Sequence, residues 1–364
     1  MLENLMNAKK KVIFSAGGTG GHVYPALAIA KNLILENYDV LWIGTTRGLE
    51  KKIIEAESIN IKYINFQGIR NKGFITILKS PFLLLRACYQ VYKIYKFYKP
   101  DLTICFGGYV TVPCGLISFL KKIPLFIHEQ NSVLGLSNKI LSLFSQKTLM
   151  GYRKPGSKYL YSGNPMRESI NRISKKEKNF KNNLNILVLG GSLGAKVFNE
   201  RIPFAAKQLI EKYKIKNLEI VHQAGKTHGI AQDNYKKLNI NCNVKEYIDN
   251  IQEYYEWCDI VICRSGAISL AELMTVGIPS ISIPYKYATD NHQYHNAKLL
   301  SDAGALVLMD ENLFDGYSLA EKIYKIISVK NLYKKIHNNT RNFSHFHSKE
   351  KILGEIKKHF KNNI

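Results

Sequence analysis

Two glycine-rich segments of this sequence have the residue types of a turn that binds an anion. The first reads Ala16-Gly17-Gly18-Thr19-Gly20-Gly21-His22, and the second reads Gly190-Gly191-Ser192-Leu193-Gly194-Ala195. Each follows an apolar run and precedes a helical pattern, so each should join a strand to a helix. Glycine lets the backbone approach a ligand closely, and a helix N-terminus offers unpaired N–H groups with partial positive charge. Both turns therefore suit a phosphate or a sugar phosphate.

The first turn is neither of the two commonest nucleotide-binding loops. It lacks the Gly-Lys-Ser/Thr of a P-loop, and Val23 stands where a dinucleotide fingerprint has its third glycine. His22 therefore needs another explanation. A neutral imidazole at this place is suited to removing a proton near pH 7.

Polar residues follow three further predicted strands. Cys105-Phe106-Gly107-Gly108-Tyr109 contains another glycine turn, and His128-Glu129-Gln130-Asn131 ends the next strand. In the second half, Cys263-Arg264-Ser265-Gly266-Ala267 precedes a helix that carries Glu272. That helix N-terminus could receive a phosphate, and the carboxylate could accept both hydroxyls of a ribose. The sequence contains no Asp-x-Asp, no zinc-spaced cluster and no Gly-x-Ser-x-Gly elbow.

The elements that must position these residues alternate between strand and helix. Apolar runs predict strands at 11–16, 40–44, 63–66, 102–106, 125–128, 147–150, 185–190, 219–222, 244–247, 260–263, 280–283 and 305–309. Helical patterns between them include 48–56, 112–121 and 137–144. This alternation predicts an α/β protein with two doubly wound parallel sheets, whose ligands bind beyond the carboxyl ends of the strands.

Glycine and proline near Gly163-Asn164-Pro165 mark the junction between the halves. We therefore expect a first domain over 1–163 and a second over 164–345, with a helix in 346–364 returning to the first domain. The two domains should face a central cleft lined by both glycine turns.

Composition narrows the class of partner. The chain has 364 residues, a net charge of +24 and an isoelectric point near 9.6, which favours nucleic acid, an anionic membrane or phosphate-bearing substrates as partners. A lysine-rich proteome is the alternative cause. The six cysteines form no Cys-x-x-Cys and should be reduced thiols in the cytoplasm. We expect neither a signal peptide nor a membrane-spanning helix, because no sufficiently long apolar run occurs.

The segment from Lys72 to Lys99 has six basic residues and no acidic one. Ser80-Pro81 has the pattern of a helix start, and apolar and tyrosine-rich faces follow it. Such a helix suits an anionic membrane surface, although a buried helix with a solvated lysine face or a tyrosine-rich surface for RNA would share the pattern. The proposed membrane contacts are Lys72, Lys79, Phe82, Leu85, Arg86 and Lys93.

Taken together, these motifs resemble the bacterial MurG family of N-acetylglucosaminyltransferases. The resemblance covers nearly the whole chain through the ordered segments GGTGGHVYPALAIA, CFGGYV, HEQNSVLGLSNK, GNPMR, GGSLGA, EYIDN, CRSGAISLAE and YATDNHQYHNA. It implies a GT-B fold of two Rossmann-like domains. It also implies transfer of N-acetylglucosamine (GlcNAc) from UDP-GlcNAc to the C4 hydroxyl of undecaprenyl-pyrophosphoryl-muramyl-pentapeptide (lipid I), which gives lipid II with inversion.

The resemblance carries further expectations. UDP-GlcNAc would be a substrate, with no cofactor or metal required in the site and no nucleic acid bound. The protein would lie peripherally on the cytoplasmic face of the inner membrane with cell-wall synthesis proteins as partners, in peptidoglycan synthesis that supports cell shape and division.

The resemblance also implies roles for individual residues. The base that removes the acceptor proton would be His22, or alternatively Glu129. The donor-binding residues would be Thr19, Gly20, Gly21, Asn131, Arg167, Ser192, Ile248, Ala267, Ile268, Glu272 and Gln293. The lipid-linked diphosphate would meet Gly17, Gly18, Gly107, Gly108 and Tyr109.

The chain departs from the family pattern in three places. Thr111-Val112-Pro113-Cys114 replaces a smaller, glycine-containing run, Leu193 replaces a frequent glutamine, and the segment before Gln293 is one residue longer than the family pattern. Three other functions fit parts of the pattern: a UDP-GlcNAc epimerase of similar fold, another UDP-sugar transferase with a lipid acceptor, and a basic binding protein without catalysis.

Overall fold

A computed structural model describes most of the chain. The described residues are 9–68, 74–153, 159–173, 183–191 and 194–362, with only the backbone described for 74–79. The chain forms two compact units, and each is described by itself below. The first unit consists of residues 1–166 and 347–364, and the second of residues 167–346.

The first unit is built on a parallel sheet whose strand order among the described residues is β3-β2-β1-β4-β5-β6-β7. The strands are β1 (Lys11–Ser15), β2 (Asp39–Gly44), β3 (Ile61–Tyr63), β4 (Leu102–Cys105), β5 (Leu125–Glu129), β6 (Lys147–Met150) and β7 (Leu160–Tyr161). The order runs outward in both directions from β1 and β4, which is the doubly wound arrangement. Parallel strands buried on both faces read as continuous apolar runs, which is why the sequence shows them so clearly.

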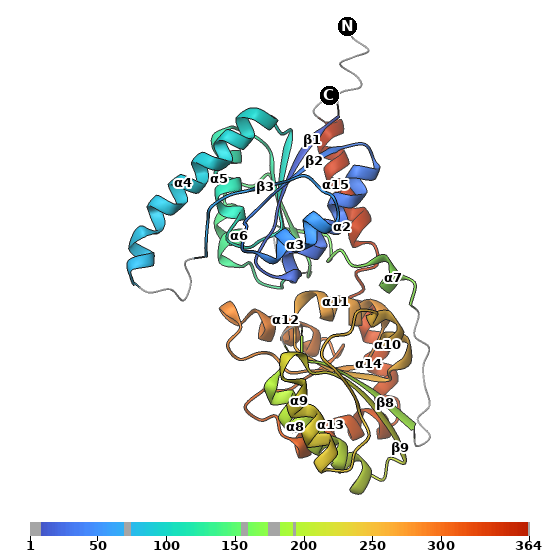
Figure 1. The fold of residues 1–364 in the computed structure, drawn as a ribbon. Helices are drawn as coiled ribbons and strands as arrows, with labels where there is room; N and C mark the ends of the chain where they lie inside the picture. Colours follow the sequence, from blue (N-terminus) through green and yellow to red (C-terminus); the bar gives the residue numbers. More distant parts are fainter. Residues whose placement is uncertain (1–8, 69–73, 154–158, 174–182, 192–193, 363–364) are drawn as a thin grey trace. The chain divides into compact units, whose positions relative to one another are not determined.

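Helices cover both faces of this sheet (Figure 1). One face packs against α2 (Gly20–Leu35), α3 (Leu49–Ala56) and the C-terminal α15 (Ser348–Lys361), which inserts Ile352, Ile356 and Phe360 into the core. The other face packs against α4 (Phe74–Tyr98), α5 (Thr111–Leu120) and α6 (Leu136–Leu141). The C-terminal helix is therefore part of the first unit although it follows the second unit in sequence.

The second unit repeats this plan with the order β10-β9-β8-β11-β12-β13. Its strands are β8 (Asn183–Leu189), β9 (Asn217–Gln223), β10 (Asn243–Lys245), β11 (Ile260–Cys263), β12 (Ser280–Ser282) and β13 (Val307–Leu308). One face is covered by α8 (Lys196–Glu211), α9 (His228–Lys237) and α13 (Gly316–Ser328). The other face carries α10 (Ile251–Trp257), α11 (Ala267–Val276) and α12 (His292–Asp302), while α7 (Glu168–Asn171) and α14 (Leu332–Arg341) pack on α11.

The structure differs from the sequence prediction at a few elements. Helix α4 begins at Phe74 and passes through Pro81, so the predicted start at Ser80-Pro81 is wrong. A proline removes one helical hydrogen bond, and the turns on either side can keep theirs. The third strand ends at Tyr63, where we predicted its start. The two-residue strand β7 was not predicted. None of the described helices combines the length and apolar character that crossing a bilayer requires.

Candidate active site

The glycine turns of the first unit leave the sheet side by side. Ser15 at the end of β1 pairs with Cys105 at the end of β4, so the turns that follow them start at the same level. These two strands are also where the strand order reverses, since β2 and β3 lie on one side and β5 to β7 on the other. Ligands of doubly wound sheets bind at this switch point.

The two turns are joined by close backbone contact. The amide of Gly17 donates to the carbonyl of Gly107 over 3.3 Å. Gly108 has φ of +89°, and a Cβ atom on it would lie only 2.3 Å from the carbonyl oxygen of Gly17. Any other residue at position 108 would push the turns apart. Tyr109, which follows Gly108, is hydrogen-bonded to the loop after β2: its hydroxyl lies 3.3 Å from Oγ1 of Thr45.

His22 sits in the first turn of α2 with a defined ring orientation. Its Nδ1 lies 3.1 Å from the carbonyl oxygen of Gly17. A carbonyl only accepts hydrogen bonds, so Nδ1 must carry the proton and Nε2 is then the basic nitrogen. The other side of the ring packs on Gly107, where a Cβ atom would lie 3.1 Å from Nε2. Both glycine turns thus hold the imidazole.

Glu129, the other candidate base, ends β5 and is 2% exposed. Its Oε1 accepts from the amide and the side-chain Nδ2 of Asn131, at 3.0 and 2.9 Å. Its Oε2 accepts from the amide of Gly135 and from Nδ2 of Asn138, both at 2.9 Å. Four donors therefore surround the carboxylate, which organises the loop from Asn131 to Asn138.

His128 precedes this carboxylate and is fully buried. Burial lowers the pKa of its imidazole from 6.5 to about 4, against the opposing effect of its hydrogen bond to the carbonyl of Gly163. Its Nε2 donates to that carbonyl over 2.8 Å, and its Nδ1 accepts from Nε2 of Gln130 over 3.1 Å. A neutral His128 thus links the strand end to the last residues of the first unit.

The second unit has an equivalent switch point. Leu189 at the end of β8 pairs with Cys263 at the end of β11, so Gly190 and the turn at 264–266 start at the same level of the sheet. Gly194 has φ of +78°, and a Cβ atom there would overlap the carbonyl of Ala224 at 2.1 Å. Gln223 joins Gly191 to Ile248: its Nε2 donates to the carbonyl of Gly191, and its Oε1 accepts from the amide of Ile248.

Glu272 lies on α11, whose N-terminus opens directly after the turn at 264–266. The side chain is buried, with its residue 5% exposed. Oε2 accepts from the hydroxyl of Tyr255 at 2.9 Å, and Oε1 lies 3.4 Å from Nη2 of Arg167. Burial raises the pKa of this carboxyl, while Arg167 and the Tyr255 hydrogen bond act in the opposite direction. Each oxygen retains capacity to accept a further hydrogen bond, as a ribose would require.

The guanidinium of Arg264 lies against the loop that follows β12. It pairs with Glu311 at 2.7 Å and donates to the carbonyls of Ile283 and Pro284. Glu311 also accepts from the amide of Lys286. Both charged side chains are only 11% exposed, so this ion pair is a fixed support for the loop that follows β12.

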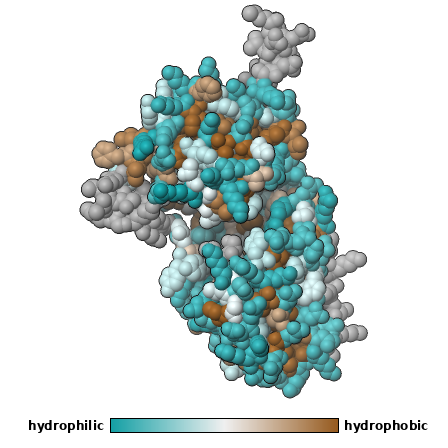
Figure 2. Space-filling model, viewed as in Figure 1, coloured by the Kyte–Doolittle hydropathy of each residue, from teal (hydrophilic) through white to brown (hydrophobic). Residues whose placement is uncertain are grey.

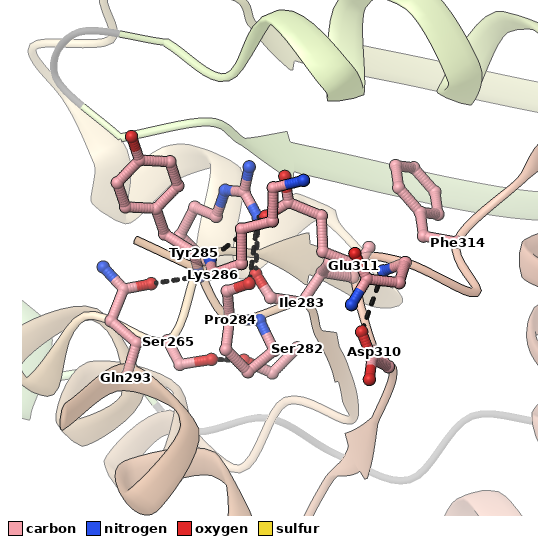
Figure 3. A network of polar contacts seen from close by, with 12 residues as sticks. Ser265, Ser282, Ile283, Pro284, Tyr285, Lys286, Gln293, Asp310, Glu311 and Phe314 are labelled. Atoms are coloured by element: carbon pink, nitrogen blue, oxygen red, sulfur yellow. Dashed lines mark hydrogen bonds and ion pairs between the residues drawn. The ribbon is translucent and has the colours of Figure 1, made fainter. Parts of the chain in front are cut away.

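Gln293 lies in the first turn of α12, next to this supported loop. Its Oε1 accepts from the amide of Tyr285 over 2.9 Å, as Figure 3 shows. The carboxamide is thereby oriented, and its Nε2 makes no hydrogen bond to any residue that the structure describes. An oriented amide N–H₂ is a suitable donor to a sugar hydroxyl.

The predicted residues fall into two groups, one in each unit. Thr19, Gly20, Gly21 and Asn131 lie in the first unit, with His22, Glu129 and the glycine turns. Arg167, Ile248, Ala267, Ile268, Glu272 and Gln293 lie in the second unit. Ser192 and Lys72 lie outside the described residues, as does the side chain of Lys79. A cavity of about 560 Å³ beside β9 and α10 contains none of the predicted residues.

Helix α4 exposes an apolar and basic face opposite its buried one. Ala87, Val91 and Tyr95 are buried, whereas Phe82 is 75% and Leu85 67% exposed. Arg86 and Lys93 are exposed as well. At the end of α5, Phe119 and Leu120 are 57% and 72% exposed. Figure 2 shows apolar side chains reaching the surface over α4.

The structure adds polar residues that the sequence did not single out. Tyr255 and Glu311 hold predicted site residues in place, and Glu50 lies buried behind the first glycine turn. The sequence did offer a signal for Glu50, because a glutamate that follows glycines at 44 and 48 near a strand end is a candidate site residue. Tyr255 carried none, because it is one of 22 tyrosines in an ordinary helical pattern.

Comparisons with known proteins cover the whole of this arrangement. Residues 12–150 match the glycosyltransferase family 28 N-terminal domain, and residues 185–351 match the family 28 C-terminal domain. A relative from Buchnera aphidicola subsp. Baizongia pistaciae is 39% identical over 360 residues, covering 91% of this chain and 99% of that protein. It is named UDP-N-acetylglucosamine–N-acetylmuramyl-(pentapeptide) pyrophosphoryl-undecaprenol N-acetylglucosamine transferase.

Solved structures agree with the sequence match. The crystal structure of Acinetobacter baumannii MurG superposes with a TM-score of 0.80 at 32% identity, covering 96% of this chain and 99% of that one. A UDP-GlcNAc 2-epimerase from Neisseria meningitidis has a TM-score of 0.65, but at 15% identity it shares the GT-B fold alone (96% of this chain, 100% of that one). The chain therefore belongs to glycosyltransferase family 28 and, within it, to the MurG family of N-acetylglucosamine transferases.

Proposed function

We propose that this enzyme transfers GlcNAc from UDP-GlcNAc to undecaprenyl-pyrophosphoryl-muramyl-pentapeptide. The observation that carries the proposal is the full-length match to relatives named for this reaction, at 39% identity in the example above. The substrates would be lipid-linked peptidoglycan precursors. The product would be the β-1,4-linked disaccharide lipid II, used in cell-wall synthesis during growth and division.

The second unit would bind the donor. Glu272 would accept the ribose hydroxyls, because its two oxygens are held in fixed directions by Tyr255 and Arg167. The N-terminus of α11, at Ala267 and Ile268, would face the diphosphate, because a helix N-terminus carries partial positive charge that favours an anion. Gln293 would donate from Nε2 to a GlcNAc hydroxyl. Ile248 would meet uracil through its carbonyl, because its amide already donates to Gln223.

The first unit would bind the acceptor and supply the base. His22 fits the base role better than Glu129, because its Nε2 is the basic nitrogen whereas the Glu129 carboxylate is buried under four donors. Nε2 would take the proton of the C4 hydroxyl as that oxygen attacks C1 of GlcNAc. The C1–O bond to UDP would break on the opposite face, which inverts the configuration. The glycines at 17, 18, 107 and 108 would receive the acceptor diphosphate.

The exposed face of α4 would lie on the cytoplasmic face of the inner membrane. Phe82 and Leu85 would enter the interface, while Arg86 and Lys93 would meet anionic headgroups. A lipid-anchored acceptor would then reach the first unit without leaving the bilayer.

One assay tests the reaction directly. Purified enzyme would be incubated with radiolabelled UDP-GlcNAc and a short-chain lipid I analogue, and the product identified by mass. We expect one added GlcNAc and equimolar UDP. Formation of an epimerised UDP-sugar without acceptor, or an absence of transfer to this acceptor, would contradict the proposal.

A further inference from the structure

Glu50 is a fully buried carboxylate to which the proposed reaction assigns no role. It lies in the first turn of α3 and is 0% exposed. Its Oε1 accepts from the amide of Thr45 at 3.0 Å and from the hydroxyl of Thr45 at 2.8 Å. Its Oε2 accepts from the amide of Gly18 at 3.3 Å. All of these donors are uncharged. The partial positive charge at the N-terminus of α3 also favours the negative carboxylate.

Three glycines border the side chain of Glu50 at positions where a larger residue would collide with it. A Cβ atom on Gly48 would overlap its carboxylate at 1.9 Å, one on Gly44 would lie 2.8 Å from its Cγ, and one on Gly17 would lie 2.9 Å from Oε1. Three glycines from two segments of the chain therefore leave room for this one side chain. A buried charge is costly unless donors are arranged around it, so this pocket is built for a carboxylate.

One peptide group connects Glu50 to His22. The amide of Gly18 donates to Glu50, and the carbonyl of Gly17 accepts from Nδ1 of His22. These two groups belong to the same planar peptide unit. A negative charge that accepts from the N–H of an amide polarises that amide and makes its carbonyl a stronger acceptor. The carboxylate thus favours the imidazole tautomer that is protonated at Nδ1 and basic at Nε2.

We propose that Glu50 is a positioning residue that orients His22 through the Gly17–Gly18 peptide group. Its role corresponds to that of the carboxylate in a catalytic triad, with one peptide unit inserted between carboxylate and imidazole. The proposal rests on the proposed function, in which His22 is the base. Thr45 extends the same chain to Tyr109, so that Glu50 also ties the first glycine turn to the second.

The test uses the full-length enzyme with Glu50→Gln and Glu50→Asp. In Glu50→Gln the side-chain N–H₂ group would face one of the N–H or O–H donors that Glu50 now accepts from, so that hydrogen bond is lost. In Glu50→Asp the charge remains, but the shorter side chain does not reach the amide of Gly18. The matched control is Glu55→Gln, an exposed glutamate on the same helix. Readouts are kcat with the lipid I analogue, the Kd of UDP, thermal unfolding, and ¹⁵N NMR of the imidazole of His22, which distinguishes the two tautomers.

We expect both Glu50 variants to lower kcat by about 10- to 100-fold, the scale of a small misplacement of a catalytic group. UDP affinity should stay within about twofold, because the contacts proposed for the uracil, the ribose and the diphosphate lie in the second unit. The NMR signal of His22 should move from a protonated Nδ1 toward a mixture of tautomers. In a His22→Ala background, Glu50→Gln should cost less than about threefold, because residues that act as one unit are not additive.

Several results would overturn this proposal. An unchanged kcat and tautomer in a folded Glu50 variant would exclude the relay, as would an additive effect in the His22→Ala background. If Glu50→Gln fails to fold, the aspartate variant decides by the same readouts. If His22→Ala itself keeps normal kcat, the assignment of the base is wrong and the proposed function, not only the relay, must be revised.

Discussion

Replacing Glu272 by glutamine should weaken UDP binding while making the second unit more stable. The carboxylate is buried and its residue 5% exposed, whereas its cationic partner Arg167 has a side chain that is 51% exposed. A half-solvated ion pair contributes only about 0–1 kcal/mol, less than the cost of burying the carboxylate. The raised pKa of Glu272 has the same origin. Glutamine has the same shape without the charge.

The stability change has a defined dependence on pH. Because burial raises the pKa of Glu272 in the folded state, the folded state binds more protons than the unfolded state between the two pKa values. The free energy of unfolding therefore falls as pH rises through this window. At pH 8 the variant should exceed the wild type by about 1 kcal/mol, or roughly 2–4 °C in Tm for a domain of this size. The difference should vanish below the ordinary glutamate pKa.

The loss of affinity follows from the ribose contacts. Hydrogen bonds to a charged group contribute about 1.5–3 kcal/mol each, and a neutral carboxamide can accept only through its one oxygen. We expect a loss of about 2–4 kcal/mol, or on the order of 30- to 1000-fold in the Kd of UDP. Tyr255 retains a partner in the variant, because its hydroxyl can turn to accept from the new N–H₂ group.

Calorimetry measures both effects on one preparation. Titration gives the Kd of UDP, and thermal scans from pH 4 to 8 give the transition that UDP stabilises, which identifies the second unit. Glu321→Gln, at an exposed glutamate of α13, is the control and should change neither quantity. A Glu272→Gln protein that is less stable at pH 8 and binds UDP normally would refute both the ribose assignment and the reasoning on burial.

Three further predictions address the first unit. His22→Ala should lower kcat by about 10²-fold or more while the Kd of UDP is unchanged in calorimetry; a normal kcat would remove His22 from the base role. Gly108→Ala, at φ of +89° and against the carbonyl of Gly17, should destabilise the turn by about 1–3 kcal/mol and abolish transfer to the lipid acceptor, and a fully active variant would show that the turns need not touch. Replacing Phe82 and Leu85 by serine should reduce co-sedimentation with anionic vesicles and leave kcat on a soluble acceptor unchanged; equal binding to neutral vesicles would exclude an electrostatic contribution.

Local patterns were enough to predict most elements of the fold. Strands buried on both faces read as apolar runs, and each glycine turn stands directly between a strand and a helix, so neither needs long-range information. The prediction failed at Ser80-Pro81, where local helix-start chemistry is present but α4 continues through it. The short edge strands β3 and β10 were misplaced, because packing at a sheet edge decides their ends.

The candidate site could be predicted only as a set of residues. Glu272 and Glu129 are each a glutamate near a strand end or helix start, and the sequence alone does not show which hydrogen-bond partners surround either carboxylate. The structure surrounds Glu129 with four donors from its own loop and leaves Glu272 with two partners from distant segments. A carboxylate can bind a ligand or accept a proton only through lone pairs that other donors do not already occupy. The donors that occupy them come from residues elsewhere in the chain.

By itself, the order of the residues determined where the buried central strands end, where glycine must stand and which functional groups are available, because these depend on neighbours along the backbone. Only the tertiary structure decided that Glu50, Gly18, Gly17 and His22 form one hydrogen-bonded chain. Hydrogen bonds are directional and reach about 3 Å, so they require atoms to be placed by the packing of β1, β2 and β4 in one sheet. No pattern along a single segment contains that placement.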